Sequence, residues 1–183
     1  MRTKVTTLMI WPHTISDIWR RARARLNRPR VELAPHLALG QRGEALAAAY
    51  LERAGYRLVA ANFKLPVGRN SRGALVHAEV DLIAYDGDTL CFIEVKTRAS
   101  DWFAAPEANV DLRKQRQITR AARIYRRLLG VTAAAYRFDV VSVILPPSPD
   151  TRAGEQTNEH APHLRLLRAF WTEEKFRKRR WAE

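Results

Sequence analysis

Two strand-like runs joined by a tight turn constrain the fold of this chain most strongly. Residues 78–84 and 89–97 are rich in apolar side chains, and Asp86, Gly87 and Asp88 lie between them. An Asp-Gly pair between two such runs is a signal for a β-hairpin. The sequence therefore predicts an antiparallel hairpin, and the fold must contain a sheet that includes it.

Helical periodicity is present on both sides of this hairpin. Apolar side chains recur at helical spacing over 39–54, and Gly55 is placed to end that helix. A second helix is predicted from a cap at Asp111 to Leu129, with Gly130 as its stop. Its apolar stripe consists of Ile118, Ala121, Ala122, Tyr125, Leu128 and Leu129.

Three further segments have the composition of strands. Residues 56–63 and 163–168 are short candidates, while 136–145 is apolar on both faces, as expected of a central strand. Residues 66–73 are rich in turn formers and are predicted to be a mobile loop. The order of elements indicates an α/β fold with a central mixed β-sheet flanked by helices.

The charge of the chain indicates its partners rather than its fold. Lys and Arg number 32 against 19 Asp and Glu, a formal net charge of +13, which favours nucleic acid ahead of membrane. A length of 183 residues suits one domain. We assign that domain to 36–170, with a polar linker at 146–162, a basic and flexible arm at 1–35 and a basic tail at 171–183.

Other features of the sequence indicate the cellular compartment and exclude several kinds of active site. The single cysteine, Cys91, excludes an intramolecular disulfide, and the apolar start at 6–10 is too short for a signal peptide or a membrane span. We therefore expect a cytoplasmic protein. The sequence has no Gly-rich phosphate loop and no nucleophile elbow, and His160 and His163 lack the cysteine cluster of a zinc site.

The first strand of the hairpin carries two carboxylates. Strand alternation predicts that Glu79 and Asp81 share one face, with Val80 and Leu82 on the other. These acids follow residues that resemble sheet interior, where an isolated charge costs several kcal/mol or more unless it is paired or bound to a metal. A compensating partner is therefore expected.

The second strand places an acid and a base together, Glu94 and Lys96. If the strands pair antiparallel, Asp81 or Glu79 lies near Glu94, and a divalent cation would relieve their repulsion. Oxygen ligands suit Mg²⁺ or Mn²⁺, which polarises a phosphodiester and acidifies bound water. Lys96 would stabilise developing charge or position the attacking water. A salt-bridged surface pair fits the spacing equally well.

Five motifs occur in order along most of the chain. They are 40–44 (GQRGE), 79–83 (EVDLI), 92–98 (FIEVKTR), Lys114 and 137–141 (RFDVV). This set resembles the YraN family of predicted endonucleases, which is similar to archaeal Holliday-junction resolvases. The resemblance implies the restriction-endonuclease-like fold, with Asp81 and Glu94 as metal ligands and Lys96 as the catalytic lysine. It also implies that Glu44 is a helix-borne acid facing the same site.

Several of these side chains have an alternative interpretation. Glu44 could instead be a surface glutamate at the start of a helix, favourable to the helix dipole. Lys114 lies one turn before Ile118 on the apolar stripe, so it can point toward the sheet rather than into solvent. It could approach a phosphate, or merely extend its amine past the apolar surface. Arg98 follows Lys96 on the same face and is interpreted as a phosphate contact. The candidate nucleic-acid-binding residues are therefore Arg98, Lys114, Arg113, Arg116 and Arg120.

The chain departs from the family pattern in an apparent insertion at 66–76 and in its arginine-rich arm, which predicts an altered approach for substrate. The leading hypothesis is a Mg²⁺- or Mn²⁺-dependent endonuclease that hydrolyses phosphodiester bonds in DNA, with branched or structured DNA as the candidate substrate. A noncatalytic nucleic-acid-binding protein with a nuclease-like fold is the main alternative, and a scaffold for an acidic protein partner is a third. The resemblance also suggests a homodimer.

Overall fold

The computed structural model describes residues 35–99, 110–145 and 161–176. The basic arm expected at 1–35, the linker expected at 146–162 and the tail expected at 171–183 lie largely outside these residues. Within the described ranges, no helix is long and apolar enough to cross a membrane.

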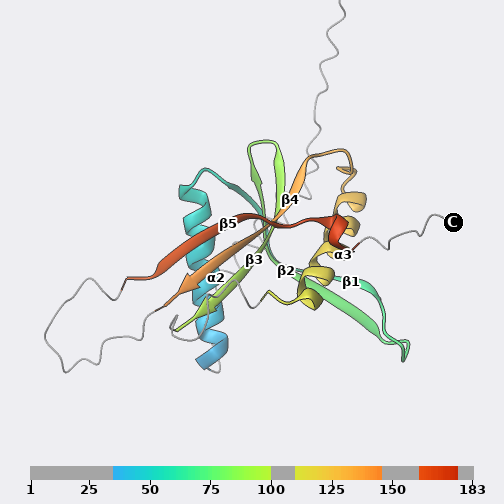
Figure 1. Cartoon of the computed structure of the whole chain (residues 1–183), viewed down its shortest axis with the longest axis horizontal. Coiled ribbons are helices and arrows are strands. Elements are labelled where there is room, and N and C mark those ends of the chain that lie inside the picture. Colours follow the sequence, from blue (N-terminus) through green and yellow to red (C-terminus); the bar gives the residue numbers. More distant parts are fainter. Residues whose placement is uncertain (1–34, 100–109, 146–160, 177–183) are drawn as a thin grey trace, which may run out of the picture.

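Five strands form one mixed sheet in chain order (Figure 1). They are β1 (Arg57–Arg69), β2 (Leu75–Asp86), β3 (Thr89–Arg98), β4 (Tyr136–Ile144) and β5 (His163–Trp171). Only β3 and β4 pair in parallel, and the chain between them runs through α3 (Leu112–Leu128). The other helix, α2 (Pro35–Arg53), precedes β1. This architecture confirms the predicted α/β fold and is consistent with a restriction-endonuclease-like fold.

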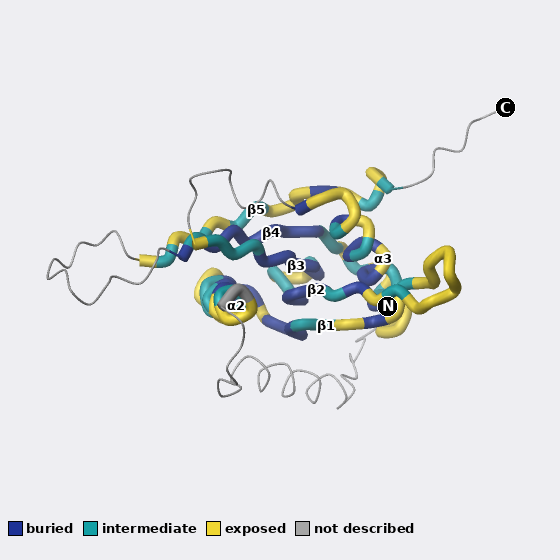
Figure 2. The backbone as a smooth tube through the Cα atoms, turned by 90° about the horizontal axis from the view of Figure 1, so that it is seen from below, coloured by how far each residue is buried: buried dark blue, intermediate teal, exposed yellow. Residues whose placement is uncertain are grey.

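The two helices cover opposite faces of the sheet (Figure 2). Ile118 of α3 belongs to a buried apolar cluster with Phe92, whereas Leu51 of α2 belongs to a second cluster with Ile93. Neighbouring residues of β3 therefore point into different cores, as strand geometry requires. Each helix buries one apolar stripe, and the sheet is covered on both sides.

The hairpin and α3 lie where the sequence predicts them, whereas α2 begins at Pro35, before the predicted start at residue 39. Asp86 pairs with Thr89 across the turn, and Gly87 has a φ of 58°, a conformation that glycine adopts without strain. Asp111 caps α3 by accepting a hydrogen bond from the backbone N–H of Lys114 at 2.7 Å. Local turn and cap chemistry thus sets these boundaries.

The last turn of α3 differs from the prediction. Leu128 and Leu129 were expected on the apolar stripe but are 72% and 36% exposed. The buried part of the stripe ends at Tyr125, whose ring meets those of Phe63 and Phe92 edge to face. The final turn therefore extends beyond the apolar core.

The prediction of a loop at 66–73 is wrong for the first half of that segment. Strand β1 continues to Arg69, and Pro66 pairs with His77 of a correspondingly longer β2. An irregularity follows Pro66, which has no N–H to donate, and an edge strand tolerates this loss. Only the turn after Arg69 remains, where the Asn70 side chain accepts hydrogen bonds from two backbone N–H groups. The insertion is thus mainly a β-ribbon.

Strand β5 also continues past the predicted 163–168 to Trp171. The Trp171 ring is buried and stacks on Phe138, with centroids 4.9 Å apart. The folded part of the chain therefore extends beyond residue 170, into a 3₁₀ turn at Glu173–Phe176.

A glycine sets the distance between α2 and β3. A Cβ atom added at Gly43 would lie 1.8 Å from Oγ1 of Thr97, far inside contact distance. Any larger residue would push the helix from the strand. Glu44 is the next residue, so this close approach also determines how far its carboxylate reaches over the sheet.

Replacing Gly43 by alanine is expected to lower the free energy of unfolding by about 1–3 kcal/mol, because overpacking must be relieved by moving the helix. Gly40→Ala is the matched control, since a Cβ there has nothing within 4 Å. That change should instead stabilise α2 by about 0.5–1 kcal/mol through helix propensity. Urea denaturation measures both. Equal effects of the two substitutions would contradict the proposed close packing.

Candidate active site

The geometry of the site begins where β2 and β3 part. Their backbone pairing runs from the hairpin turn to Leu82 and stops there. The next residue, Asp81, instead accepts a hydrogen bond through its carboxylate from the backbone N–H of Val95 at 2.8 Å. The side chain thus takes the place of a strand carbonyl, and the two strands separate around it.

This separation corrects one prediction about β2. Val80 and Leu82 were expected on the same face, but Val80 packs in the core under α3 and Leu82 in the core under α2. Strict alternation holds only while a strand stays regular. Here it is interrupted at Asp81, opposite Asn62 of β1, which adopts a φ of 52°.

Two carboxylates meet at this point. Asp81 is 8% exposed and Glu94 is 1% exposed. Nζ of Lys114 lies 3.5 Å from Oδ1 of Asp81 and 3.0 Å from Oε2 of Glu94, and Nζ of Lys96 lies 2.8 Å from Oε1 of Glu94. The structure therefore brings together Asp81, Glu94 and Lys96. Of the two acids on β2, it places Asp81 rather than Glu79 beside Glu94.

It is electrostatically unfavourable for Asp81 and Glu94 both to be ionised. Burial raises the pKa of Asp81, and the nearby charge of Glu94 raises it further. Burial alone would lower the pKa of Lys114, but the charges of Asp81 and Glu94 outweigh that effect and raise it. Lys114 therefore stays charged and partly neutralises two acids that repel each other.

Glu44 approaches from the opposite helix. Its carboxylate is half-buried and hydrogen-bonded to Asn62, and burial raises its pKa in spite of that bond. The charges of Glu94 and Lys114 also act on it, which places it near the same site. Because α2 begins at Pro35, Glu44 lies well inside the helix. The alternative of a surface glutamate at the helix start is therefore wrong.

The predicted nucleic-acid-binding residues lie in three different places. Lys114 points at the carboxylates, so it belongs to the site rather than to an outer binding surface. Arg113, Arg116 and Arg120 are exposed on the other side of α3. Arg98 is half-buried at the end of β3, where its carbonyl accepts a hydrogen bond from the N–H of Leu145.

Sequence reasoning missed two contributors to the site. Asn62 holds Glu44 by a hydrogen bond, and its only sequence signal is a polar residue inside an apolar strand. The shared contact of Lys114 with both acids was also not predicted. Its position on the apolar stripe of α3 was the available signal, because a lysine there must either reach past the core or find buried partners.

Asp81 and Glu94 are the side chains that could hold a divalent cation. Oε2 of Glu94 is buried and lies 3.0 Å from Nζ of Lys114, an ion pair that lacks hydrogen-bond geometry. Among the described residues, no group of three or more His, Cys, Asp or Glu is placed to hold a metal. Mg²⁺ is often bound by one or two carboxylates together with water and phosphate oxygens. The pair therefore fits a hydrated Mg²⁺ or Mn²⁺.

A second polar cluster lies at the hairpin end of the sheet. Arg137 donates hydrogen bonds to Asp139 at 2.9 Å, to Oη of Tyr56 at 2.7 Å and to Asp86 at 2.6 Å. Asp139 is fully buried and also accepts from the backbone N–H of Ala169 at 2.8 Å. This cluster ties β4 to the hairpin and to β5, which gives the RFDVV motif a structural role.

Comparison with known proteins identifies relatives across the whole site. The model of the uncharacterised protein family UPF0102 matches residues 43–143, a range that contains Glu44, Asp81, Glu94 and Lys96. UPF0102 proteins of Chlorobium chlorochromatii and Chlorobium limicola are each 40% identical to this chain. These matches cover 74% and 76% of the chain and 93% and 95% of the relatives. A UPF0102 protein of Geobacter sulfurreducens is 44% identical over 61% of the chain and 79% of its own length.

Asp81→Asn is expected to stabilise the protein in the absence of divalent ions. A raised folded pKa means that ionised Asp81 costs stability above the unfolded pKa, near 3.8. The amide keeps an acceptor for Val95 and removes the repulsion with Glu94. The gain should be at least about 1 kcal/mol at neutral pH, equivalent to roughly one pKa unit.

This gain should shrink as the pH falls from neutral toward the unfolded pKa, near 3.8, and vanish below it, where the carboxyl of the wild type is protonated in both states. Chemical denaturation in EDTA at several pH values measures the dependence. Glu52→Gln, an exposed change on α2, is the control and should leave stability nearly unchanged. A loss of stability in Asp81→Asn at neutral pH would show that the carboxylate is well compensated.

Proposed function

The chain belongs to the UPF0102 family, the YraN family that its motifs resemble, and from that premise and the site geometry we propose a metal-dependent endonuclease that hydrolyses phosphodiester bonds in DNA. The observation that carries the proposal is the buried pair of Asp81 and Glu94, with Lys96 beside it. A sheet gains no stability from two acids placed together in this way. A buried carboxyl whose pKa is raised by burial and by a neighbouring acid, as at Asp81, is typical of functional sites.

A divalent cation is the partner that best fits the pair. It would be held by Asp81 and Glu94, and when bound it would polarise a phosphodiester oxygen and acidify a water molecule. The burial of both carboxylates and the raised pKa of Asp81 support this assignment, because they indicate that the two lysines beside the pair do not fully compensate the cost of burying it. Mg²⁺ and Mn²⁺ suit an oxygen-only donor set.

The other side chains have roles that follow from their positions. Lys96 is held by its ion pair with Glu94, so its ammonium is oriented toward the reacting groups and can donate to an attacking water or to a phosphate oxygen. Lys114 keeps its charge and balances the acids. Glu44 has a raised pKa and an anchored position, so it can hold or accept a proton at the edge of the site.

The nature of the substrate follows from charge and from the family. A net charge of +13 and a basic helix beside the site support a polyanion. The choice of DNA, with branched or structured forms as candidates, rests on the resemblance to junction resolvases, and so does a homodimeric state. Such a substrate would place the protein in the cytoplasm. The alternative, nucleic-acid binding without catalysis, is supported by the same basic helix.

Cleavage of labelled duplex, single-stranded, flapped and four-way-junction DNA tests the proposal directly. With Mg²⁺ or Mn²⁺ the wild type should cut at least one of these substrates, and EDTA should stop it. Glu94→Gln and Lys96→Met should each lower the rate on the order of 10²-fold or more, because each removes a charge that acts at the reacting atoms. Glu52→Gln is the matched control and should cut normally. Equal cutting by Glu94→Gln would refute the proposed site.

A thermal-shift titration with Mg²⁺ or Mn²⁺ gives a readout that is independent of activity. Binding to the folded state should stabilise the wild type by about 2.7 kcal/mol at a hundred times the dissociation constant. The double variant Asp81→Asn/Glu94→Gln should show no shift. A shift in the wild type without cleavage of any substrate would favour the noncatalytic alternative, and an equal shift in the double variant would place the metal elsewhere.

A further inference from the structure

Helix α3 is unusually basic for a helix that packs on a sheet. It has seven basic residues and no acidic residue in 17 positions. Like charges three or four residues apart destabilise a helix, and the dipole disfavours cations in its first turn, where Arg113 and Lys114 lie. Only the apolar stripe meets the core, and among the arginines Arg123 and Arg126 hydrogen-bond to neighbouring segments of the fold. These contacts do not account for the whole set, so the remaining arginines need an explanation outside the fold.

Five of these residues share one face of the helix. The arginine track, as we name it, consists of Arg113, Arg116, Arg120, Arg123 and Arg127. Successive members are three or four positions apart, so their side chains form a row. The row spans 14 positions, about 20 Å at 1.5 Å per residue. It begins beside Lys114, which turns to the carboxylates, and it runs away from the candidate active site.

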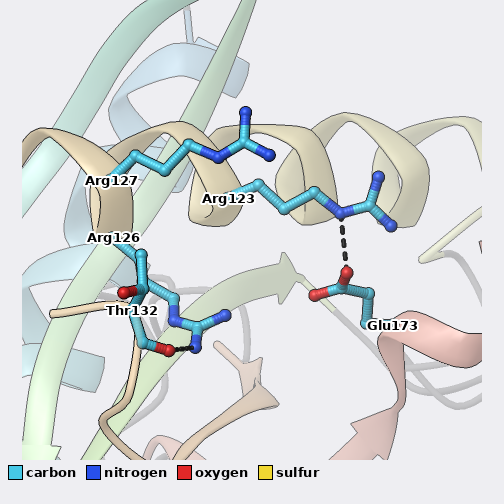
Figure 3. Close-up of a pocket in the computed structure, with 5 residues that line it drawn as sticks. All are labelled: Arg123, Arg126, Arg127, Thr132 and Glu173. Atoms are coloured by element: carbon cyan, nitrogen blue, oxygen red, sulfur yellow. Dashed lines mark hydrogen bonds and ion pairs between the residues drawn. The ribbon is translucent and has the colours of Figure 1, made fainter.

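A pocket lies at the far end of the track (Figure 3). It measures about 420 Å³ and is lined by Arg123, Arg126, Arg127, Thr132 and Glu173. Nε of Arg123 donates to Glu173 at 2.8 Å, and Arg126 donates to the carbonyl of Thr132. Figure 3 shows the side chains of Arg123 and Arg127 extending in the same direction along the helix.

This pocket carries excess positive charge. Three arginines line it together with one carboxylate, Glu173, which accepts hydrogen bonds from Arg123 and Tyr136. Nε of Arg126 is buried without a hydrogen-bond partner, and its guanidinium lies 3.6 Å from the centroid of the Tyr136 ring. Arg127 is exposed and forms no ion pair within the described part of the chain. The exposed guanidinium donors of Arg127, in a polar hollow lined by two further arginines, suit a phosphate group.

We propose that the pocket is a second phosphate-binding site, which seats a backbone phosphate of the nucleic acid about 20 Å from the candidate active site. The arginine track contacts the phosphates between the two sites. At 3.4 Å per base pair, this distance corresponds to roughly six base pairs of duplex. The inference takes from the proposed function only that the substrate is a nucleic acid, and it assigns the surface along which that substrate lies.

The lining of the pocket favours a nucleic acid over an acidic protein. Protein interfaces are usually centred on apolar or aromatic anchors that fill pockets. All five lining residues here are charged or polar, and the charges of the track repeat at regular steps. A polyanion with regularly spaced phosphates matches such a row, whereas a protein surface would need to supply acids at the same spacing.

The salt dependence of binding tests the inference with a matched pair of variants. Arg127→Gln removes one charge from the pocket, and Arg53→Gln removes one exposed charge from the end of α2, on the other face of the sheet. Affinity for a fluorescent DNA duplex is measured by anisotropy in EDTA at a series of salt concentrations. Loss of one phosphate contact should reduce the slope of log K against log salt by about 0.9. Arg53→Gln should leave the slope unchanged.

The outcomes separate this inference from the proposed nuclease activity. With a cleavable substrate, Arg127→Gln should raise KM several-fold and leave kcat unchanged, because the contact is remote from the reacting atoms. A reduced slope together with no cleavage by the wild type would support the binding surface and reject the nuclease. If the slope of Arg127→Gln equals that of the wild type, the inference is overturned, even if Glu94→Gln abolishes cleavage. An acidic protein segment would then be the better candidate ligand for the pocket.

Discussion

The shared contact of Asp81 and Glu94 with Lys114 is the interaction around which the rest of the molecule is arranged. Asp81 enters the interior only because β2 and β3 stop pairing and its carboxylate takes a backbone N–H of β3. The first turn of α3 must lie over this opening for Lys114 to reach both acids. On the other face, α2 must approach β3 closely enough for Gly43 to touch Thr97 and for Glu44 to arrive at the same point.

The sequence predicts the elements well because their signals are local. A glycine turn at Gly87, a cap at Asp111 and the apolar periodicity of the helices each specify structure within a few residues. It predicts the irregular places poorly, because they depend on pairing between segments. The break of alternation at Asp81 and the ribbon through Pro66 both follow from what the partner strand does. The meeting of Asp81, Glu94 and Lys96 was predictable, while the contribution of Asn62 was not.

Helix α3 has three roles, and each depends on side chains from a different face of the helix. The stripe of Ile118 and Tyr125 fills the core, Lys114 turns to the acids, and the arginine track faces outward. Burial of the stripe holds the helix together in spite of the repulsion between its arginines. The same rigid element thus fixes the distance between the candidate active site and the far pocket.

The carboxylates of the two polar clusters have opposite electrostatic environments. At the hairpin end, Asp139 and Asp86 are matched by Arg137, whose hydrogen bond lowers the pKa of Asp86. Around Asp81, burial and the charge of Glu94 raise the pKa of its carboxyl, although Lys114 contacts both acids. One fold can therefore satisfy buried acids fully where their role is structural. The unfavourable burial of Asp81 beside Glu94 is specific to that site, and it is the physical reason to expect that a cation binds there.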